Sequence, residues 1–167
     1  MAVIPPVCKF GWKAPDFSLP STRGANITRS SARGPNGLLV MFICNHCPYV
    51  LAVLNKIIRD ADDLKVFGVG VVAVSSNDVK TYPQDSFLNM AEMAIDRAFS
   101  FPYLYDESQD MARAYGAACT PDFFGFNSRL ELQYRGRLDA STNKEGSKSL
   151  RRDLFEAMKL IATTGKG

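Results

Sequence analysis

Residues 38–74 contain the strongest fold signal in the chain. This stretch opens with Leu38-Leu-Val-Met-Phe-Ile43, continues through Cys44-Asn-His-Cys47 and closes with Val69-Gly-Val-Val-Ala-Val74. Both apolar runs are continuous, which is typical of central parallel strands that are buried on both faces. Residues 49–64 between them have helical period, and Pro48 fits the first turn of that helix. We therefore predict one β-α-β unit, with the helix's polar residues, including Lys56 and Asp60, on the side away from the core.

Outward from this unit, the chain alternates short strands and helices. We expect an edge strand at 15–20, a helix at 85–99 with Phe87 and Met90 inward, an extended segment at 102–105 and a helix at 108–115 that Gly116 stops. A hairpin at 123–134 and a last helix capped by Ser147 complete the pattern. The predicted fold class is a three-layer α/β domain with a mixed sheet, one domain over 1–167 in which 1–36 is an N-terminal extension.

Length and composition exclude several classes of protein. The chain has 167 residues, 46% hydrophobic and 22% charged, close to globular averages, which excludes collagen, coiled coil and wholly disordered chains. Its 20 basic and 17 acidic residues give +3, and no basic stretch is long or interleaved with aromatics, so we expect no nucleic-acid partner. No apolar run approaches the ~20 residues of a membrane span. The N-terminus lacks a basic n-region, so we expect a cytoplasmic protein with reduced cysteines and no membrane partner.

The chemistry is predicted to lie in Cys44-Asn45-His46-Cys47, where the buried strand gives way to the helix. The unpaired N–H groups and partial positive charge of a helix N-terminus stabilise a thiolate, the species that attacks disulfides. We assign Cys44 as the nucleophile because it is expected to be the exposed thiol, and Cys47, one turn inside, as the resolving thiol. His46, the one histidine of the chain, is expected to favour the Cys44 thiolate and so to make the couple more oxidising.

The cysteines have two other interpretations. Cysteine is often a buried apolar residue, but the strand-to-helix junction favours chemistry. A zinc site built from Cys44, Cys47, His46 and Cys119 would be cramped, and the sequence has no second Cys-x-x-Cys or His pair. We therefore expect no metal and no other cofactor.

Two cysteine-bearing motifs carry a family resemblance. Cys44-x-x-Cys47 after a buried strand, followed by Thr120-Pro121 before the hairpin, resembles the thioredoxin superfamily. The opening Gly11-x-x-Ala-Pro-Asp-Phe-x-Leu19 resembles the start of peroxiredoxins of the alkyl-hydroperoxide-reductase/thiol-specific-antioxidant class. Together they look like a peroxiredoxin-like subgroup of thioredoxin-fold proteins, over about residues 10–140. The resemblance implies a thioredoxin-like fold, in which Pro121 is a cis-proline beside the cysteine loop and Thr120 and Pro121 shape a substrate groove.

The sequence also departs from these families. Peroxiredoxins place Thr or Ser three residues before the peroxide-reducing cysteine. If Cys47 is that cysteine here, Cys44 occupies the Thr or Ser position. The activating Arg of peroxiredoxins has no counterpart near Thr120. No Asp or Glu lies between residues 35 and 47, so this strand supplies no buried acid. Cys119 remains a possible third thiol, although alternation along an extended segment favours its pointing away.

These observations predict a thiol–disulfide oxidoreductase that acts on a protein or small-molecule disulfide, with a thioredoxin-type or glutathione thiol as electron donor. One alternative is a weak antioxidant thiol peroxidase with Cys47 attacking peroxide and Cys44 resolving. The other is a non-catalytic redox sensor or binding module that docks a partner in one redox state. The sequence does not specify the oligomeric state.

Overall fold

A single mixed sheet, flanked by helices, organises the protein. The structure, a computed structural model, describes residues 10–117, 119–141 and 150–166. Its elements are, in order, β1 (Ser18–Pro20), β2 (Asn26–Thr28), α1 (Arg29–Ala32), β3 (Gly37–Phe42), α2 (Pro48–Lys65), β4 (Val69–Ser75), the 3₁₀ turn η1 (Pro83–Asp85), α3 (Phe87–Asp96), β5 (Tyr103–Tyr105), α4 (Asp110–Tyr115), β6 (Asp122–Asn127), β7 (Leu132–Gly136) and α5 (Asp153–Thr164). Ser147, the predicted cap of the last helix, lies outside the described residues.

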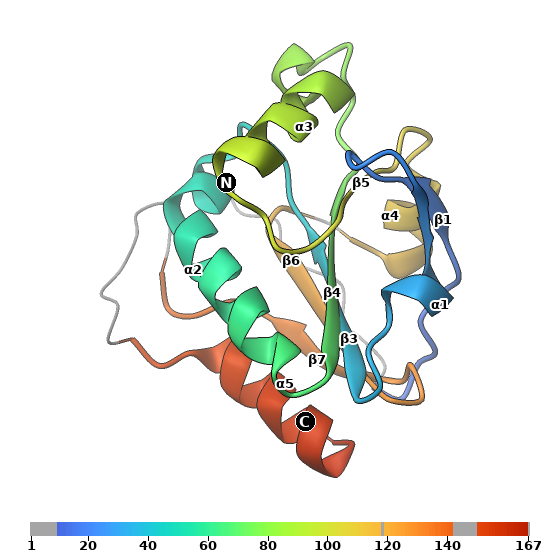
Figure 1. The fold of residues 1–167 in the computed structure, drawn as a ribbon, viewed down its shortest axis with the longest axis vertical. Helices are drawn as coiled ribbons and strands as arrows, with labels where there is room; N and C mark the ends of the chain where they lie inside the picture. The colour runs from blue at the N-terminus through green and yellow to red at the C-terminus, as the bar shows by residue number, and fades with distance from the viewer. Residues whose placement is uncertain (1–9, 118, 142–149, 167) are drawn as a thin grey trace.

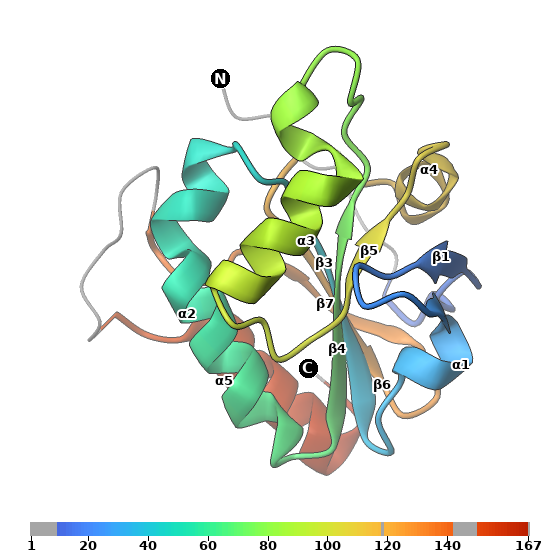
Figure 2. The same cartoon turned by 45° about the horizontal axis from the view of Figure 1, so that its top comes forward.

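The strands run in the order β5-β4-β3-β6-β7, with β3 at the centre (Figures 1 and 2). β3 pairs antiparallel with β6 along its whole length, and β4 pairs parallel with β5. At the carboxyl ends of β3 and β4, the Ile43 N–H donates to the Val74 carbonyl at 2.9 Å, which joins the two halves. The predicted β-α-β unit and mixed sheet are confirmed.

The two faces of the sheet pack against different parts of the chain. Leu39, Met41 and Ile43 point to one face, where α2, α3 and α5 cover them. Leu38, Val40 and Phe42 alternate to the other face, against the N-terminal segment and α4. Every residue of β3 is buried, so the continuous hydrophobicity of the strand reflects its position between two layers of core.

Two sequence-based expectations about helices are wrong. The predicted helix 85–99 is shorter, because η1 ends at Asp85, α3 ends at Asp96, and Ala98 has a left-handed φ of 52°. Phe87, expected inside, is 39% exposed, whereas Met90 is fully buried as predicted. The first turn of α3 therefore lies partly outside the core.

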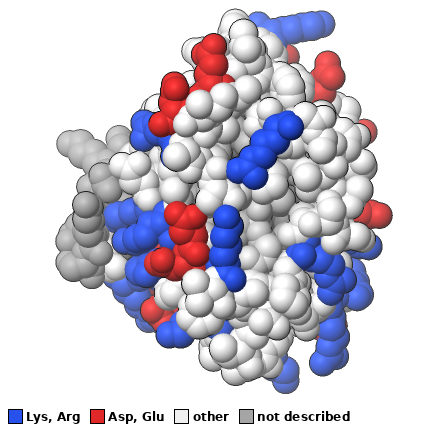
Figure 3. All heavy atoms as spheres, viewed as in Figure 1, with Lys and Arg blue, Asp and Glu red and all other residues white. Residues whose placement is uncertain are grey.

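The polar side of α2 is also partly buried, which corrects the expected outward-facing side chains. The Lys56 ammonium lies 2.9 Å from an Asp139 carboxylate oxygen, and both side chains are buried. Asp60, 1% exposed, accepts from the Arg152 guanidinium at 2.6 Å. The segments on either side of residues 142–149 thus cover this side of α2, and Figure 3 shows acidic and basic side chains side by side over α2 and α5. None of the helices in the described part of the chain has the length and apolar character needed to cross a bilayer.

Candidate functional site

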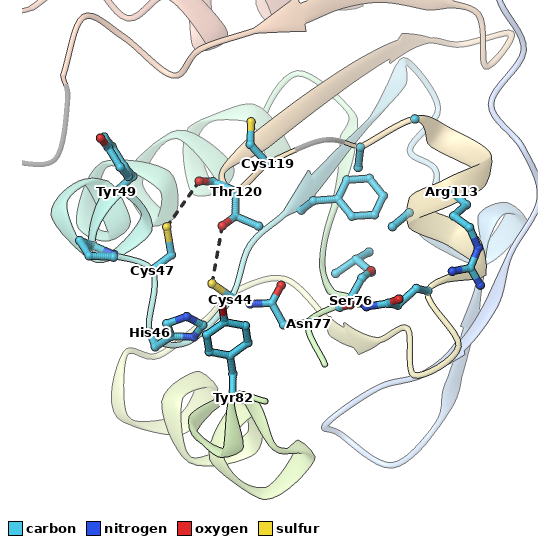
Figure 4. Close-up of a pocket in the computed structure, with 17 residues that line it drawn as sticks. Cys44, His46, Cys47, Tyr49, Ser76, Asn77, Tyr82, Arg113, Cys119 and Thr120 are labelled. Carbon is cyan, nitrogen blue, oxygen red and sulfur yellow. Dashed lines mark hydrogen bonds between the residues drawn. The ribbon is translucent and has the colours of Figure 1, made fainter. Parts of the chain in front are cut away.

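A groove of about 720 Å³ opens at the carboxyl ends of β3 and β4 (Figure 4). Its walls come from the cysteine loop and first turn of α2, the segment after β4, α4 and the residues before β6. The lining includes Cys44, His46, Cys47, Tyr82, Cys119 and Thr120. The carboxyl ends of strands, where loops rather than sheet continue, are where α/β sheets commonly bind ligands. The groove therefore contains the predicted cysteine pair and the predicted Thr120.

Cys47 occupies the N-cap of α2, directly before Pro48 at the first helical position. Its side chain is half-buried and opens on the groove. A hydrogen bond from the Cys44 thiol is the largest cause lowering the pKa of Cys47, from 9.0 to about 5. Hydrogen bonds from Thr120 and from the backbone N–H groups of Val50 and Tyr49 lower the pKa further, while burial opposes them. Cys47 is therefore poised as a thiolate at neutral pH.

Cys44 lies beneath Cys47 and is only 1% exposed. The hydrogen bond with Cys47 and burial raise the pKa of Cys44 well above its usual range, and the nearby negative charge of Asp85 adds to this. Cys44 therefore holds its proton and donates it toward the Cys47 sulfur. The sequence-based expectation that Cys44 is the exposed thiol and Cys47 the inner one is wrong. The reason is that α2 begins after Cys47, so the helix N-terminus points at Cys47, whereas Cys44 lies two residues after the end of β3 and is still buried.

Thr120 faces both sulfurs, as Figure 4 shows. Its peptide bond to Pro121 is cis, as the resemblance implied. The Cys44 sulfur lies 3.6 Å from the Thr120 hydroxyl, and the Cys47 thiol, when protonated, donates to the Thr120 carbonyl at 3.4 Å. Thr120 thus lies beside both cysteine sulfurs in the wall of the groove.

His46 contacts an acid that sequence reasoning missed. Its Nδ1 lies 2.6 Å from Oδ2 of Asp85, whose side chain is fully buried, and its ring stacks on Tyr82 at 4.6 Å. The Asp85 carboxylate also accepts from the Asn45 N–H at 2.7 Å and from the Asn77 side chain at 2.9 Å. No acid comes from the cysteine-bearing strand, but η1 brings one from about forty residues further along. No sequence spacing could have paired Asp85 with the cysteine loop, since α2, β4 and the irregular segment 76–82 separate them.

The Cys44 sulfur, a His46 ring nitrogen and an Asp85 oxygen lie within 4.8 Å of one another, so these are the described residues that a metal ion could use. Two nitrogen or oxygen ligands on one tetrahedral zinc ion, with bonds of about 2.0 Å, lie about 3.3 Å apart. The 2.6 Å separation of His46 and Asp85 is shorter than that. These two atoms are therefore in direct contact and are too close to ligate one zinc ion together.

Cys119 and Asp122 flank Thr120-Pro121. The Cys119 sulfur points away from the other two cysteines in Figure 4, and burial raises the pKa of its thiol. Asp122 is buried and bonds to the Arg135 guanidinium at 2.8 Å. Arg135 also donates to the Gly116 carbonyl at 3.0 Å, so it ties the segment before Thr120 to the hairpin.

Comparisons with known proteins bear on this site. The family model described as AhpC/TSA family matches residues 10–137. No curated protein matches the chain. An uncharacterized conserved protein from Geobacillus kaustophilus is 39% identical, with a TM-score of 0.89 over 95% of this chain and 84% of the other. A hypothetical protein from Sinorhizobium meliloti is 34% identical, with a TM-score of 0.91 over 97% and 88%.

The fold itself is that of thioredoxin. The thioredoxin domain of a thiol-disulfide oxidoreductase from Bacteroides vulgatus superimposes with a TM-score of 0.66 at 13% identity, over 78% of this chain and 90% of that one. At that identity the likeness concerns the fold alone. The predicted thioredoxin-like fold is therefore confirmed.

Proposed function

The chain belongs to the AhpC/TSA family, and from this premise we propose that it is a thiol–disulfide oxidoreductase in which Cys47 attacks and Cys44 resolves. The observation that carries the proposal is the contrast between the two thiols. Cys47 opens on the groove at the N-terminus of α2 with a pKa of about 5, whereas Cys44 is 1% exposed beneath it. These roles reverse the assignment made from the sequence, which rested on Cys44 being the exposed thiol.

The reaction balances with the two cysteines and a disulfide. The Cys47 thiolate attacks one sulfur of the substrate, the substrate S–S bond breaks, and one substrate thiolate leaves. Cys44 then loses its proton and attacks the Cys47 sulfur, which forms the Cys44–Cys47 disulfide and releases the second substrate thiolate. The substrate has gained two electrons. Thiol–disulfide exchange with a donor dithiol, or with two glutathione molecules, returns the pair to its reduced form.

The groove is the place we propose for the substrate disulfide, which a protein or a small molecule can present. The backbone at Thr120 lies beside Cys47 and can pair with an extended peptide as an added strand. No metal ion or nucleotide enters any step. The electron donor we propose is a thiol of the thioredoxin or glutathione type, as a reducing compartment such as the cytoplasm provides.

A trapping experiment tests the roles. Cys44→Ser should accumulate a mixed disulfide between Cys47 and its substrate, because the resolving thiol is gone, and Cys47→Ser should accumulate none. Both proteins are incubated with a disulfide-bonded peptide under non-reducing conditions and analysed by mass spectrometry, with Cys119→Ser as the control that should behave like wild type. Trapping by Cys47→Ser alone would restore Cys44 as the nucleophile.

A weak thiol peroxidase is the second candidate, because a low-pKa thiolate also attacks peroxide. In that reaction the Cys47 thiolate becomes a sulfenic acid, and Cys44 condenses with it to release water. Cys44 occupies the position three residues before Cys47 where the family has Thr or Ser. The Arg135 guanidinium is bonded to the Asp122 carboxylate. We therefore expect slow oxidation.

Stopped-flow oxidation by hydrogen peroxide, run beside disulfide reduction on the same preparation, separates the two activities. Peroxide should oxidise Cys47 at the rate of a free thiolate of similar pKa. If peroxide instead reacts much faster than the disulfide, the peroxidase becomes the leading function. A redox sensor without turnover would be indicated if neither substrate were consumed catalytically.

A further inference from the structure

In the reaction proposed above, on which this inference rests, the resolving step needs a proton acceptor that the two cysteines do not supply. Cys44 must become a thiolate before it can attack the Cys47 sulfur. Its side chain is 1% exposed, so bulk water has little access to it. In the reduced pair the hydrogen bond with Cys47 is the largest cause that raises the pKa of Cys44, and burial adds to it. Burial still disfavours the Cys44 thiolate in the mixed disulfide, where Cys47 is no longer a thiolate. A group next to Cys44 that accepts the proton would therefore speed this step.

One pair of side chains is in reach. A ring nitrogen of His46 and a carboxylate oxygen of Asp85 lie within 4.8 Å of the Cys44 sulfur and of each other. A separation of this size leaves room for one water to relay the proton, or for a small approach of the side chains in the reacting complex, where catalytic hydrogen bonds are often shorter than in the free enzyme. The other titratable groups around the pair are Cys47, Tyr82 and Tyr103; the Tyr103 hydroxyl donates to Asn45 at 2.9 Å.

The pair is also held in place. Asp85 is fully buried and takes hydrogen bonds from Asn45 and Asn77, while Tyr82 stacks on the His46 ring. A buried carboxylate is costly unless donors surround it, and a structure retains such a group where its partners are fixed. Asp85 Oδ2 thus lies 2.6 Å from His46 Nδ1, and both side chains are confined by their neighbours.

We propose that the His46–Asp85 pair accepts the proton of Cys44 during resolution. The S–H bond of Cys44 breaks, the proton passes to the pair, and the pair changes from a net charge of −1 to 0. The new thiolate attacks the Cys47 sulfur and the second substrate thiolate leaves, which takes up a proton from the pair or from water. No oxidant other than the bound substrate disulfide is needed. His46 thereby acts on the second half of the reaction, not on the first attack.

A chromogenic aryl disulfide, dithiobis(nitrobenzoate), resolves the two halves in a stopped-flow instrument. Attack by Cys47 releases one coloured thiolate, and resolution by Cys44 releases the second. The background is Cys8→Ser/Cys119→Ser, which removes the other two of the chain's four cysteines so that only the pair reacts. Asp85→Asn and His46→Phe should leave the first phase unchanged and slow the second by about 100-fold at pH 7, the usual size of general-base assistance. The deficit should shrink as pH rises, because hydroxide then ionises Cys44. Asp78→Asn, an exposed carboxylate in the same segment, is the control.

Whether the second phase slows or speeds up distinguishes proton acceptance by the His46–Asp85 pair from a purely electrostatic effect of Asp85. The charge of Asp85 raises the pKa of Cys44, so removing the charge alone would make more Cys44 thiolate and speed the second phase. A slower second phase therefore identifies a proton acceptor. An unchanged or faster second phase in both variants, or equal slowing of both phases, would overturn the inference. His46→Phe keeps a ring to stack on Tyr82 and so covers the case in which Asp85→Asn does not fold.

If the proposed roles of Cys44 and Cys47 are wrong, the same assay gives a different result. Cys44→Ser should release one coloured thiolate and Cys47→Ser none in the fast phase. If Cys47→Ser releases the first thiolate quickly, Cys44 is the nucleophile and the proposed function is wrong before the pair is tested.

Discussion

The hydrogen bond between the two thiols gives Cys44 an effect on Cys47 before any resolution occurs. Because the Cys44 thiol is the largest cause of the lowered pKa of Cys47, Cys44→Ala should raise that pKa clearly above 5. Cys44→Ser keeps a donor and should raise it less. The ultraviolet absorbance of the thiolate followed against pH measures both. Equal pKa values in wild type and Cys44→Ala would mean that the N-terminus of α2 stabilises the thiolate without help from Cys44.

Sequence reasoning predicted some residues of the site and missed others. The spacing of Cys44 and Cys47 at a strand-to-helix junction identified the pair, and Thr120-Pro121 followed from a resemblance. The exposure of the two thiols was inverted, although Pro48 in the first turn already implied that Cys47 is the N-cap. Asp85 carried no local signal, because its role depends on a tertiary contact.

At the scale of elements, hydrophobic period predicted α2 well and its polar side poorly. Periodicity identifies which side chains face the sheet, but it does not show whether another segment covers the opposite side. Lys56 and Asp60 are buried by ion pairs with Asp139 and Arg152, which are about 80 and 90 residues away in sequence. The position of α2, and therefore of Cys47 at its N-terminus, depends on those pairs as well as on the core.

Breaking one of those pairs should destabilise the protein. Asp139→Ala leaves the buried Lys56 ammonium without its carboxylate and should lower the free energy of unfolding by about 3 kcal/mol. Lys56→Met/Asp139→Ala should recover most of this, since an apolar side chain of similar length needs no partner. Urea unfolding measures both, and Asp110→Ala in an exposed pair should cost less. A double variant as unstable as the single one would show that packing of Asp139, not charge, matters.

At the scale of the whole molecule, the sheet was predictable because the composition of its central strands indicates that they are buried on both faces. Residues 38–43 are apolar throughout, and alternate residues pack into cores on opposite faces, so only a two-sided position suits them. The extended segment predicted at 102–105 matches β5 to within one residue, whereas α3 was predicted less accurately, because exposed apolar side chains such as Leu88 and Ile95 weaken its periodic signal. The carboxyl edge of this sheet is what brings the cysteine loop, η1 and Thr120 together.

The low pKa of Cys47, at this edge of the sheet, links its chemistry to the stability of the whole protein. Folding lowers the pKa of Cys47 from about 9 to about 5, so folding favours its thiolate. The contribution is fully present above the unfolded value and is lost as pH falls through 5. Reduced wild type should therefore gain free energy of unfolding relative to reduced Cys47→Ser as pH rises from 5 to 8. One proton limits the slope to about 1.4 kcal/mol per pH unit.

Taking the difference between two proteins that share every other titratable group cancels the carboxylates that dominate acid unfolding. Urea unfolding at several pH values, with excess reductant, supplies both curves. The oxidised protein provides a second comparison, because a Cys44–Cys47 disulfide has no thiolate to stabilise, so its stability should lack this rise. A wild-type minus Cys47→Ser difference that stays flat from pH 5 to 8 would show that folding does not stabilise the Cys47 thiolate. The attack step would then have to begin from a thiol that ionises only on meeting its substrate.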